Sequence, residues 1–156
     1  GLITGPLSST VTKDRLKGYK NALKKNAIAI NDTNITVGDY SISSGTLAAK
    51  DLFKNKTPPS AIFCMNDEMA IGAIQQAKKN GLNVPNDISI AGFDDISFAE
   101  FCDPPLTTIS QPAEEFGTKA MSMLYDVING NEPENKNTYL PFELIIRDST
   151  GPNKRI

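Results

Sequence analysis

The chain lacks histidine and tryptophan altogether, and its 156 residues include only two cysteines. Without histidine, the sequence excludes a Ser-His-Asp or Cys-His catalytic arrangement and any metal site built on histidine. Cys64 and Cys102 do not have the paired spacing of a zinc site, and we interpret them as two free thiols rather than a disulfide. No stretch approaches about 18 consecutive apolar residues, so the sequence predicts no membrane-spanning helix and no membrane partner.

The chain also lacks a strong excess of charge of either sign. Its 16 basic and 18 acidic side chains give a net charge of −2, which argues against direct binding of nucleic acid by these residues. Apolar residues make up 39% and charged residues 22%, values that favour a folded globular domain over a disordered chain. A glycine-rich phosphate loop is missing as well, and we predict no cofactor and no metal ion.

The stretch from Ala61 to Asp95 predicts a βαβ unit, around which the other elements can be placed. An uninterrupted apolar run over Ala61–Met65 is typical of a parallel strand buried on both faces. Asn66 is then placed to cap a helix that Gly81 ends. The run Ile88–Phe93 predicts the second buried strand.

Strands and helices alternate along the rest of the chain as well, which predicts an α/β fold with a doubly wound, mainly parallel sheet. Prolines near positions 104 and 112 indicate that the chain leaves this sheet and later returns, giving two lobes of which only one is nearly complete. The other expected elements are, in chain order, a strand end at Leu2–Thr4, a helix at Thr12–Lys25, a strand at Asn34–Val37, a helix capped by Ser43 or Ser44, a helical turn at Ser97–Phe101, an extended piece at Leu106–Ser110, a long helix at Ala113–Asn129, a polar turn at Asn131–Asn137, one or two strands within Thr138–Arg147 and a loose tail at Asp148–Ile156.

Polar side chains follow the predicted strands at the points where they end. Because the carboxyl ends of parallel strands share one edge of a sheet, we expect these side chains to surround a common ligand. Carboxylates accept hydrogen bonds from adjacent hydroxyls, a guanidinium and an amide donate to oxygens, and an aromatic ring covers a sugar or base. The set therefore suits a neutral polyhydroxylated ligand better than catalysis. Its members are Arg15, Tyr40, Asn66, Asp94 and Gln111.

Each of these residues also has a purely structural interpretation. Asn66, with Asp67 beside it, could simply cap a helix, and Asp94 could cap the turn at Ser97. Arg15 could form a surface ion pair with Asp14 or Asp39, and Tyr40 could cover the core from a loop. The expected position of all five at one edge is what favours a binding site.

The chain contains several longer motifs, which are in order GPLSS with RLKGY, VGDYS, PSAIFCMNDEMAIGA, VPNDISIAGFDD and PPLTTISQPAEEFG. In this order they resemble the effector-binding core of the LacI/GalR family of bacterial transcription regulators. The resemblance covers nearly the whole chain. It implies a two-lobed fold of the type I periplasmic-binding-protein kind, with a sugar, nucleoside or purine effector bound between the lobes.

The same resemblance implies roles for individual residues. It identifies Arg15, Asn66 and Asp94 as effector-binding, with Tyr40 lining the pocket and Gln111 at a crossover that can reach it. Ala113 stands where some family members carry an aromatic residue, so stacking from that side is in doubt.

The resemblance also divides the chain. Residues 1–110 correspond to the C-terminal lobe without its first strand and helix, residues 111–137 to a crossover and a helix of the other lobe, and residues 138–156 to a returning strand or strands and a tail. The absent strand is expected between Leu2–Thr4 and Asn34–Val37. We therefore expect these two strands to pair with each other or to borrow a strand from a neighbouring chain.

The function implied is that of an effector-binding and dimerising fragment of a cytoplasmic repressor, not an enzyme. Operator DNA would bind through a helix-turn-helix headpiece outside this chain. The homodimer interface is expected on the helix Asp67–Asn80 and at Phe101–Cys102.

Two other functions remain open at this point. A periplasmic sugar receptor for transport would be a monomer with a secretion signal. An enzyme could use a divalent metal held by acidic residues, namely Asp67, Glu68, Asp94 and Asp95.

Overall fold

Strand β1 (Leu2–Thr4) lies at the centre of a parallel sheet, and all three of its residues are buried. In the computed structural model, which describes residues 1–132 and 137–152, β1 pairs with β2 (Ile35–Val37) along one edge and with β3 (Ala61–Cys64) along the other. Strand β4 (Ser89–Ala91) pairs with β3, so the order is β2-β1-β3-β4 and each pairing is parallel. The predicted α/β fold with a mainly parallel sheet is confirmed.

No position is vacant between β1 and β2. Leu2 lies opposite Ile35 and Thr4 lies opposite Val37 in a continuous register. Each edge of a strand forms one ladder of backbone hydrogen bonds, and β1 uses its other edge for β3, so a further strand cannot lie between β1 and β2. Of the two outcomes expected for these strands, direct pairing with each other is therefore the one found.

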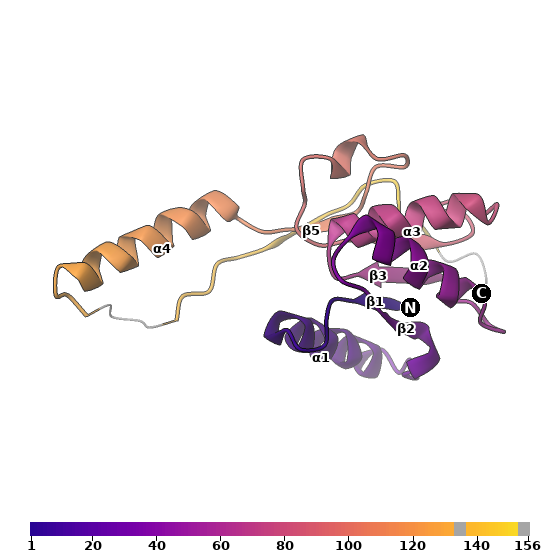
Figure 1. Cartoon of the computed structure of the whole chain (residues 1–156), viewed down its shortest axis with the longest axis horizontal. Coiled ribbons are helices and arrows are strands. Elements are labelled where there is room, and N and C mark those ends of the chain that lie inside the picture. The colour runs from indigo at the N-terminus through magenta and orange to yellow at the C-terminus, as the bar shows by residue number, and fades with distance from the viewer. Residues whose placement is uncertain (133–136, 153–156) are drawn as a thin grey trace.

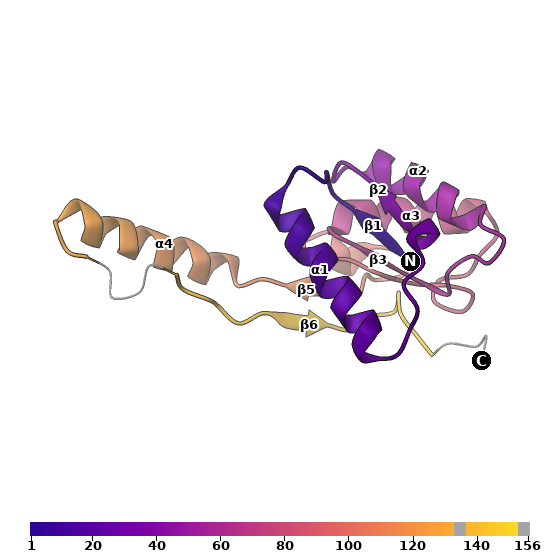
Figure 2. The same ribbon diagram turned by 90° about the horizontal axis from the view of Figure 1, so that it is seen from below.

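Two helices cover one face of the sheet and one helix covers the other (Figures 1 and 2). Helices α2 (Ile42–Phe53) and α3 (Asp67–Lys79) pack against each other on one side, and α1 (Thr10–Lys25) lies on the opposite side. Gly45 and Gly72 allow the backbones of α2 and α3 to touch, because a Cβ atom on either glycine would overlap backbone atoms of the opposite helix. A larger residue at either position would force the two helices apart.

The helix ends follow known capping rules, with one change from the expected residue. Asn66 caps α3 as predicted, and Gly81 follows the end of this helix at φ +74°. Helix α2 is capped by Ser41, whose hydroxyl accepts the backbone N–H of Ser44 at 3.2 Å. The prediction of Ser43 or Ser44 as the cap is wrong because both lie inside the first turn, whereas the cap must precede it in an extended conformation.

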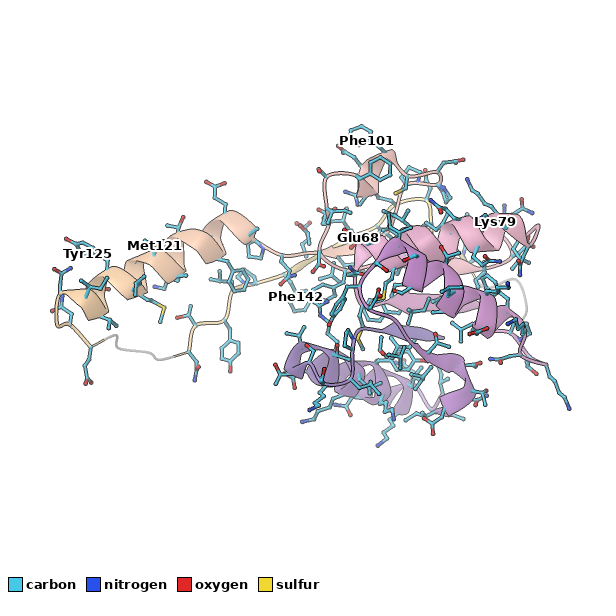
Figure 3. The ribbon with its side chains drawn as sticks, in the orientation of Figure 1. Glu68, Lys79, Phe101, Met121, Tyr125 and Phe142 are labelled. Carbon is cyan, nitrogen blue, oxygen red and sulfur yellow. The ribbon has the colours of Figure 1, made fainter. Side chains whose placement is uncertain are left out.

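The residues that follow the sheet form an arm that extends away from it (Figures 1 and 2). Strand β5 (Thr108–Ser110) leaves the lobe, and β6 (Glu143–Ile145) returns antiparallel to it. Between these strands, α4 (Ala113–Ile128) stands clear of the sheet and exposes apolar side chains such as Met121 and Tyr125 (Figure 3). The described chain thus contains one lobe and a piece that projects from it, as expected.

The segment after β6 is packed on the lobe rather than loose. Ser149 is fully buried, its N–H donates to the carbonyl of Pro105 at 2.9 Å, and its hydroxyl donates to the carbonyl of Ile90 at 2.6 Å. The predicted loose tail at Asp148–Ile156 is therefore wrong at its start, because a long-range contact ties this end of the chain to the sheet. Residues 153–156 of that tail, and residues 133–136 of the predicted turn at Asn131–Asn137, lie outside the described residues.

The remaining features are short. Cys64 is buried and Cys102 is partly exposed, and both are free thiols as predicted. The described part of the chain has two 3₁₀ helices, at Asp32–Asn34 and Ala99–Phe101. Across residues 1–132 and 137–152, no helix combines the length and apolar character needed to cross a membrane.

Candidate functional site

Three of the five predicted site residues meet at one oxygen atom. Oδ1 of Asp94, just beyond β4, accepts a hydrogen bond from Nε2 of Gln111 at 2.7 Å and lies 3.4 Å from Nη2 of Arg15. Arg15 comes from α1, and Gln111 lies on the crossover between β5 and α4. The Arg15 side chain is 17% exposed and that of Asp94 is 36% exposed, so the ion pair is shielded but still reachable from solvent. The structure therefore brings these three residues together, as predicted.

Arg15 is held in place from three directions. Besides the contact with Asp94, one guanidinium nitrogen donates to the carbonyl of Met65, at the end of β3. Its guanidinium carbon also lies 3.7 Å from the ring centroid of Phe93, a cation–π contact. The interpretation of Arg15 as a surface partner of Asp14 or Asp39 is wrong, because its ion pair is with Asp94.

Tyr40 and Asn66 form a second part of the site, on the loop after β2 and at the start of α3. The hydroxyl of Tyr40 lies 2.7 Å from Oγ1 of Thr12, and the ring packs so closely over Gly5 that a Cβ atom there would overlap it. Nδ2 of Asn66 donates to the carbonyl of Tyr40 at 2.8 Å, while its oxygen accepts the N–H of Met69 at 3.0 Å. Asn66 is thus a helix cap and also fixes the Tyr40 loop. A role in binding would come in addition to these two contacts.

Three non-glycine residues at this edge adopt a left-handed backbone conformation. The φ angles are +72° at Tyr40, +108° at Asp94 and +52° at Asp95. Each such conformation costs about 1–3 kcal/mol and persists only where the surrounding contacts impose it. Strain of this kind concentrates at functional sites, and here it occurs in the loops that carry Tyr40 and Asp94.

The carboxyl group of Asp94 is shifted toward its neutral form. Burial raises the pKa of Asp94, and this effect outweighs Arg15 and Gln111, both of which lower it. A perturbed carboxyl group in a partly open site is typical of a functional position. Hydroxyl donors from a ligand would favour the carboxylate and would replace the water lost on burial.

Asp67 has a structural role that sequence reasoning did not identify. Its side chain is fully buried, accepting the hydroxyl of Thr108 at 2.5 Å and the N–H of Ile96 at 2.9 Å. Gly92 also packs directly against this carboxylate. Burial raises the pKa of Asp67, and the hydrogen bonds from Thr108 and Ile96 oppose that shift. Asp67 therefore joins α3, the loop after β4 and β5 behind the site.

Sequence reasoning also missed Arg147, which follows β6. Its Nη2 donates to Oδ1 of Asp95 at 2.9 Å, and its Nη1 donates to the carbonyl of Leu106 at 2.9 Å. The available signal was a single cationic residue directly after the apolar run Leu144–Ile146. A charge in that position requires a partner when the strand packs on the lobe.

The acidic residues considered for a metal site do not converge. The Asp67 carboxylate faces Thr108 and Ile96, and that of Asp95 faces Arg147. Glu68 is exposed at the start of α3 (Figure 3). Among the described side chains, no group of three or more acidic or sulfur ligands is arranged to hold a metal ion. The geometry gives no support to the metal-enzyme hypothesis.

A separate apolar groove lies on the outer side of α3, away from Asp94. It has a volume of about 190 Å³, and its two aromatic residues, Phe98 and Phe101, are 57% and 69% exposed. Figure 3 shows Phe101 on the short helix that stands beside α3. Lys78 and Asp103 form an ion pair of 2.6 Å at its rim. The groove contains parts of both segments predicted to form a dimer interface.

A family model described as a periplasmic binding protein-like domain matches residues 1–150. The chain belongs to this family. The periplasmic-binding-protein-like fold predicted from the sequence is thereby confirmed for nearly the whole chain.

Curated relatives of this periplasmic-binding-protein-like chain are bacterial repressors. The HTH-type transcriptional repressor CytR of Escherichia coli (strain K12) is 44% identical over 150 residues, which cover 96% of this chain and 44% of that protein. The ribose operon repressor of Haemophilus influenzae is 38% identical over 149 residues, covering 96% of this chain and 45% of the relative. The chain thus spans less than half the length of these curated relatives.

Solved structures of similar proteins agree with this grouping. The complex of the transcriptional regulator CelR with cellobiose superposes with a TM-score of 0.91 at 31% identity, covering 96% of this chain and 46% of the other. A lac repressor dimer bound to operator and the anti-inducer ONPF gives a TM-score of 0.89 at 33% identity, covering 96% and 51%. The resemblance to the LacI/GalR regulators is confirmed.

Proposed function

We propose that this chain is the ligand-sensing and dimerising fragment of a bacterial transcriptional repressor that responds to a sugar or nucleoside. Residues 1–110 form its C-terminal lobe, residues 111–137 the crossover and a helix of the second lobe, and residues 138–156 the return. The exposed apolar face of α4 supports this division, because Met121 and Tyr125 are 64% and 69% exposed and have no core beside them in the arm. The names of the relatives support repression over transport.

The observation that carries the proposal is the shared oxygen of Asp94. The guanidinium of Arg15 on the lobe donates a hydrogen bond to this oxygen. The amide of Gln111 on the crossover donates a second one. A ligand hydroxyl that binds this oxygen of Asp94 competes with Gln111 for it. Ligand binding is thereby linked to the position of the crossover and hence to the second lobe.

The side chains favour a neutral ligand with adjacent hydroxyl groups. Asp94 accepts from hydroxyls, while Arg15 donates to their oxygens at a fixed angle because Met65 and Phe93 hold its guanidinium. Tyr40, which lies at the same edge, adds an aromatic surface for a sugar or base. Asn66 completes the set from the start of α3.

The mechanism that fits this geometry is a shift between two lobe arrangements. A ligand changes their populations only by its difference in affinity for them. Contact with Asp94 supplies this difference, because the bond from Gln111 is present in one arrangement and is replaced by ligand in the other. The lobe arrangement then alters the operator affinity of a helix-turn-helix headpiece that lies outside this chain.

The proposed repressor acts in the cytoplasm as a homodimer and catalyses no reaction. The groove between α3 and the helix at Ala99–Phe101 is the proposed interface, because an exposed aromatic pair rimmed by a charged pair matches the usual anatomy of such contacts. A lac repressor dimer is among the structures on which the chain superposes.

A ligand screen tests the proposal. The full-length gene product is heated with single pentoses, hexoses and nucleosides, alongside the variants Asp94→Ala and Asp51→Ala. Asp51 is a matched control because its ion pair with Lys54, at 2.7 Å, is exposed and far from the site. We expect one ligand class to raise the Tm of the unaltered protein and of Asp51→Ala but not of Asp94→Ala. A ligand that stabilises all three proteins equally would contradict the assigned site.

A further inference from the structure

Arg147 is the point at which three segments of the chain meet. It lies on the returning segment, and its guanidinium contacts Asp95 in the loop after β4 and the carbonyl of Leu106 on the outgoing segment, each at 2.9 Å. Its backbone also bonds to the outgoing segment, because its N–H donates to Oγ1 of Thr107 at 2.9 Å. Arg147 thus links the site loop to the outgoing segment just before β5 and to the returning segment just after β6.

The loop after β4 depends on such outside contacts for its shape. Asp94 and Asp95 are adjacent and both left-handed, with φ of +108° and +52°. The N–H of Asp94 donates to the carbonyl of Ile109 at 2.9 Å, and the N–H of Ile96 donates to Asp67 at 2.9 Å. These bonds hold the loop on either side of Asp95. Asp95 itself is held by Arg147.

The Asp95–Arg147 pair is better shielded than an ordinary surface ion pair. Its side chains are 21% and 20% exposed, whereas those of Asp51 and Lys54 are 65% and 64% exposed. Exposed pairs are screened by water and salt and contribute little. The shielded pair is therefore the one able to hold the loop in a conformation that its backbone does not prefer.

We propose that Arg147 is a positioning residue for Asp94, which it fixes through Asp95 while tying the loop to both crossover strands. Its two neighbouring aspartates then have different tasks. Asp94 contacts the ligand, and Asp95 connects that contact to the returning strand. The ligand part of this inference rests on the proposed function. The positioning part concerns the loop alone.

Amide hydrogen exchange on this chain tests the positioning part without any ligand. The variants are Arg147→Met, which keeps the apolar stem, and Asp95→Asn, which keeps the shape but removes the charge. The reporting amides are those of Asp94 and Ile96, and the reference amide is that of Met65, which bonds to Ile3 in the centre of the sheet. We expect exchange at the two loop amides to become about tenfold faster while the reference changes by less than about twofold.

The outcomes separate a positioning role from a general structural one. Faster exchange confined to the loop in both variants supports the inference, provided that the control Asp51→Asn leaves all three amides unchanged. A uniform change at all amides, or no change at the loop, overturns it. If Arg147→Met fails to fold, Asp95→Asn decides alone.

The ligand part has a separate measurement in the full-length gene product. With a ligand from the screen above, Arg147→Met and Asp95→Asn should each raise the dissociation constant about tenfold, and Asp51→Asn should leave it unchanged. An unchanged dissociation constant overturns the link from Arg147 to the ligand. If no ligand binds the unaltered protein while loop exchange still accelerates, the proposed function fails and the positioning role stands.

Discussion

Gln111 donates a 2.7 Å hydrogen bond to Asp94, and these residues belong to different parts of the molecule. Asp94 lies on the loop after β4, where its side chain contacts Arg15 of α1 and its N–H donates to the carbonyl of Ile109 in β5. Gln111 begins the connection to α4, which stands clear of the lobe. The Gln111 contact therefore lies on the path between the site and the arm, beside the backbone bond of Asp94 to β5 and the ion pair of Asp95 with Arg147. Its loss should affect communication more than binding.

The first prediction concerns Gln111→Ala in the full-length gene product. We expect ligand affinity to change by less than about tenfold, while the ligand-induced change in operator affinity, normally about 5- to 150-fold in such systems, falls toward one. Operator binding measured with and without ligand checks this. The control Asn129→Ala removes an exposed amide at the end of α4 and should leave the response intact. A normal ligand response in Gln111→Ala would refute the coupling role.

A second prediction follows from the opposite pKa shifts of Asp94 and Asp39. The pKa of Asp94 is raised by burial, so the folded chain binds this proton more tightly than the unfolded chain does. The stabilisation from Asp94 is therefore fully present below the ordinary aspartate pKa of 3.8 and is lost as pH rises through the raised value. Hydrogen bonds from Ser41 and Ser44 lower the pKa of Asp39 to about 2, so its stabilisation is present above 3.8 and is lost as pH falls toward 2.

Urea unfolding as a function of pH measures this difference. The free energy of unfolding of the unaltered chain minus that of Asp94→Asn should decrease as pH rises from about 3 to about 6. The same difference for Asp39→Asn should increase as pH rises from about 2 to about 4. A difference for Asp94 that increases with pH would show that its pKa is lowered in the folded chain, contrary to the prediction.

A third prediction concerns the buried carboxylate of Asp67. In Asp67→Ala the hydroxyl of Thr108 and the N–H of Ile96 lose their partner, which should lower the free energy of unfolding by about 1–3 kcal/mol for each group left unsatisfied. Asp67→Asn should cost less, because an amide oxygen still accepts one of these bonds and carries no charge into the interior. Urea denaturation measures both. Equal stability of Asp67→Ala and the exposed-site control Asp51→Ala would contradict this role.

A fourth prediction tests the groove on α3 as the dimer interface. Phe101→Lys places a charge in the lining of the groove, where the wild-type side chain is 69% exposed, and should weaken self-association of the full-length gene product by about 2 kcal/mol or more. Ile28→Lys is the matched control, since Ile28 is 55% exposed but remote from the groove. Sedimentation at several concentrations reports the dimer fraction. An unchanged dimer in Phe101→Lys would place the interface elsewhere.

Local patterns in the sequence predicted the alternation of strands and helices and the cap at Asn66, because these depend on neighbouring residues. The role of Ser41 as the cap of α2 was missed because residues 41–44 contain three serines. Their residue type alone does not tell which of them precedes the first turn of the helix. The partners of Asp67 and Arg147 lie 29 to 52 residues away, so no local pattern indicates them. The meeting of Arg15 with Asp94 was predicted because parallel strands share an edge.

The sheet order and the tail show a different limit. The resemblance suggested an absent strand beside β1 and left two outcomes open, direct pairing of β1 with β2 or a strand borrowed from a neighbouring chain, because the number of strands in a fragment does not determine which edges pair. Only the register of β1 with β2 answered that question. In the same way, the hydroxyl of Ser149 is buried because the backbone carbonyl of Ile90 accepts its hydrogen bond. The position of Ser149 near the end of the sequence gives no indication of this long-range contact.

The glycine contact between α2 and α3 has a consequence for how a signal crosses the molecule. At Gly45 and Gly72 the backbones of the two helices are in direct contact, with no side chain between them. Sliding or tilting one helix against the other would therefore cause a steric clash between backbone atoms. The Asn66 cap and the groove residues Ile71 and Ile74 belong to α3 and therefore move with this helix pair. We therefore expect a ligand-induced displacement to reach the arm through the two crossover strands, β5 and β6. The side of the lobe that carries the groove should move as a rigid body.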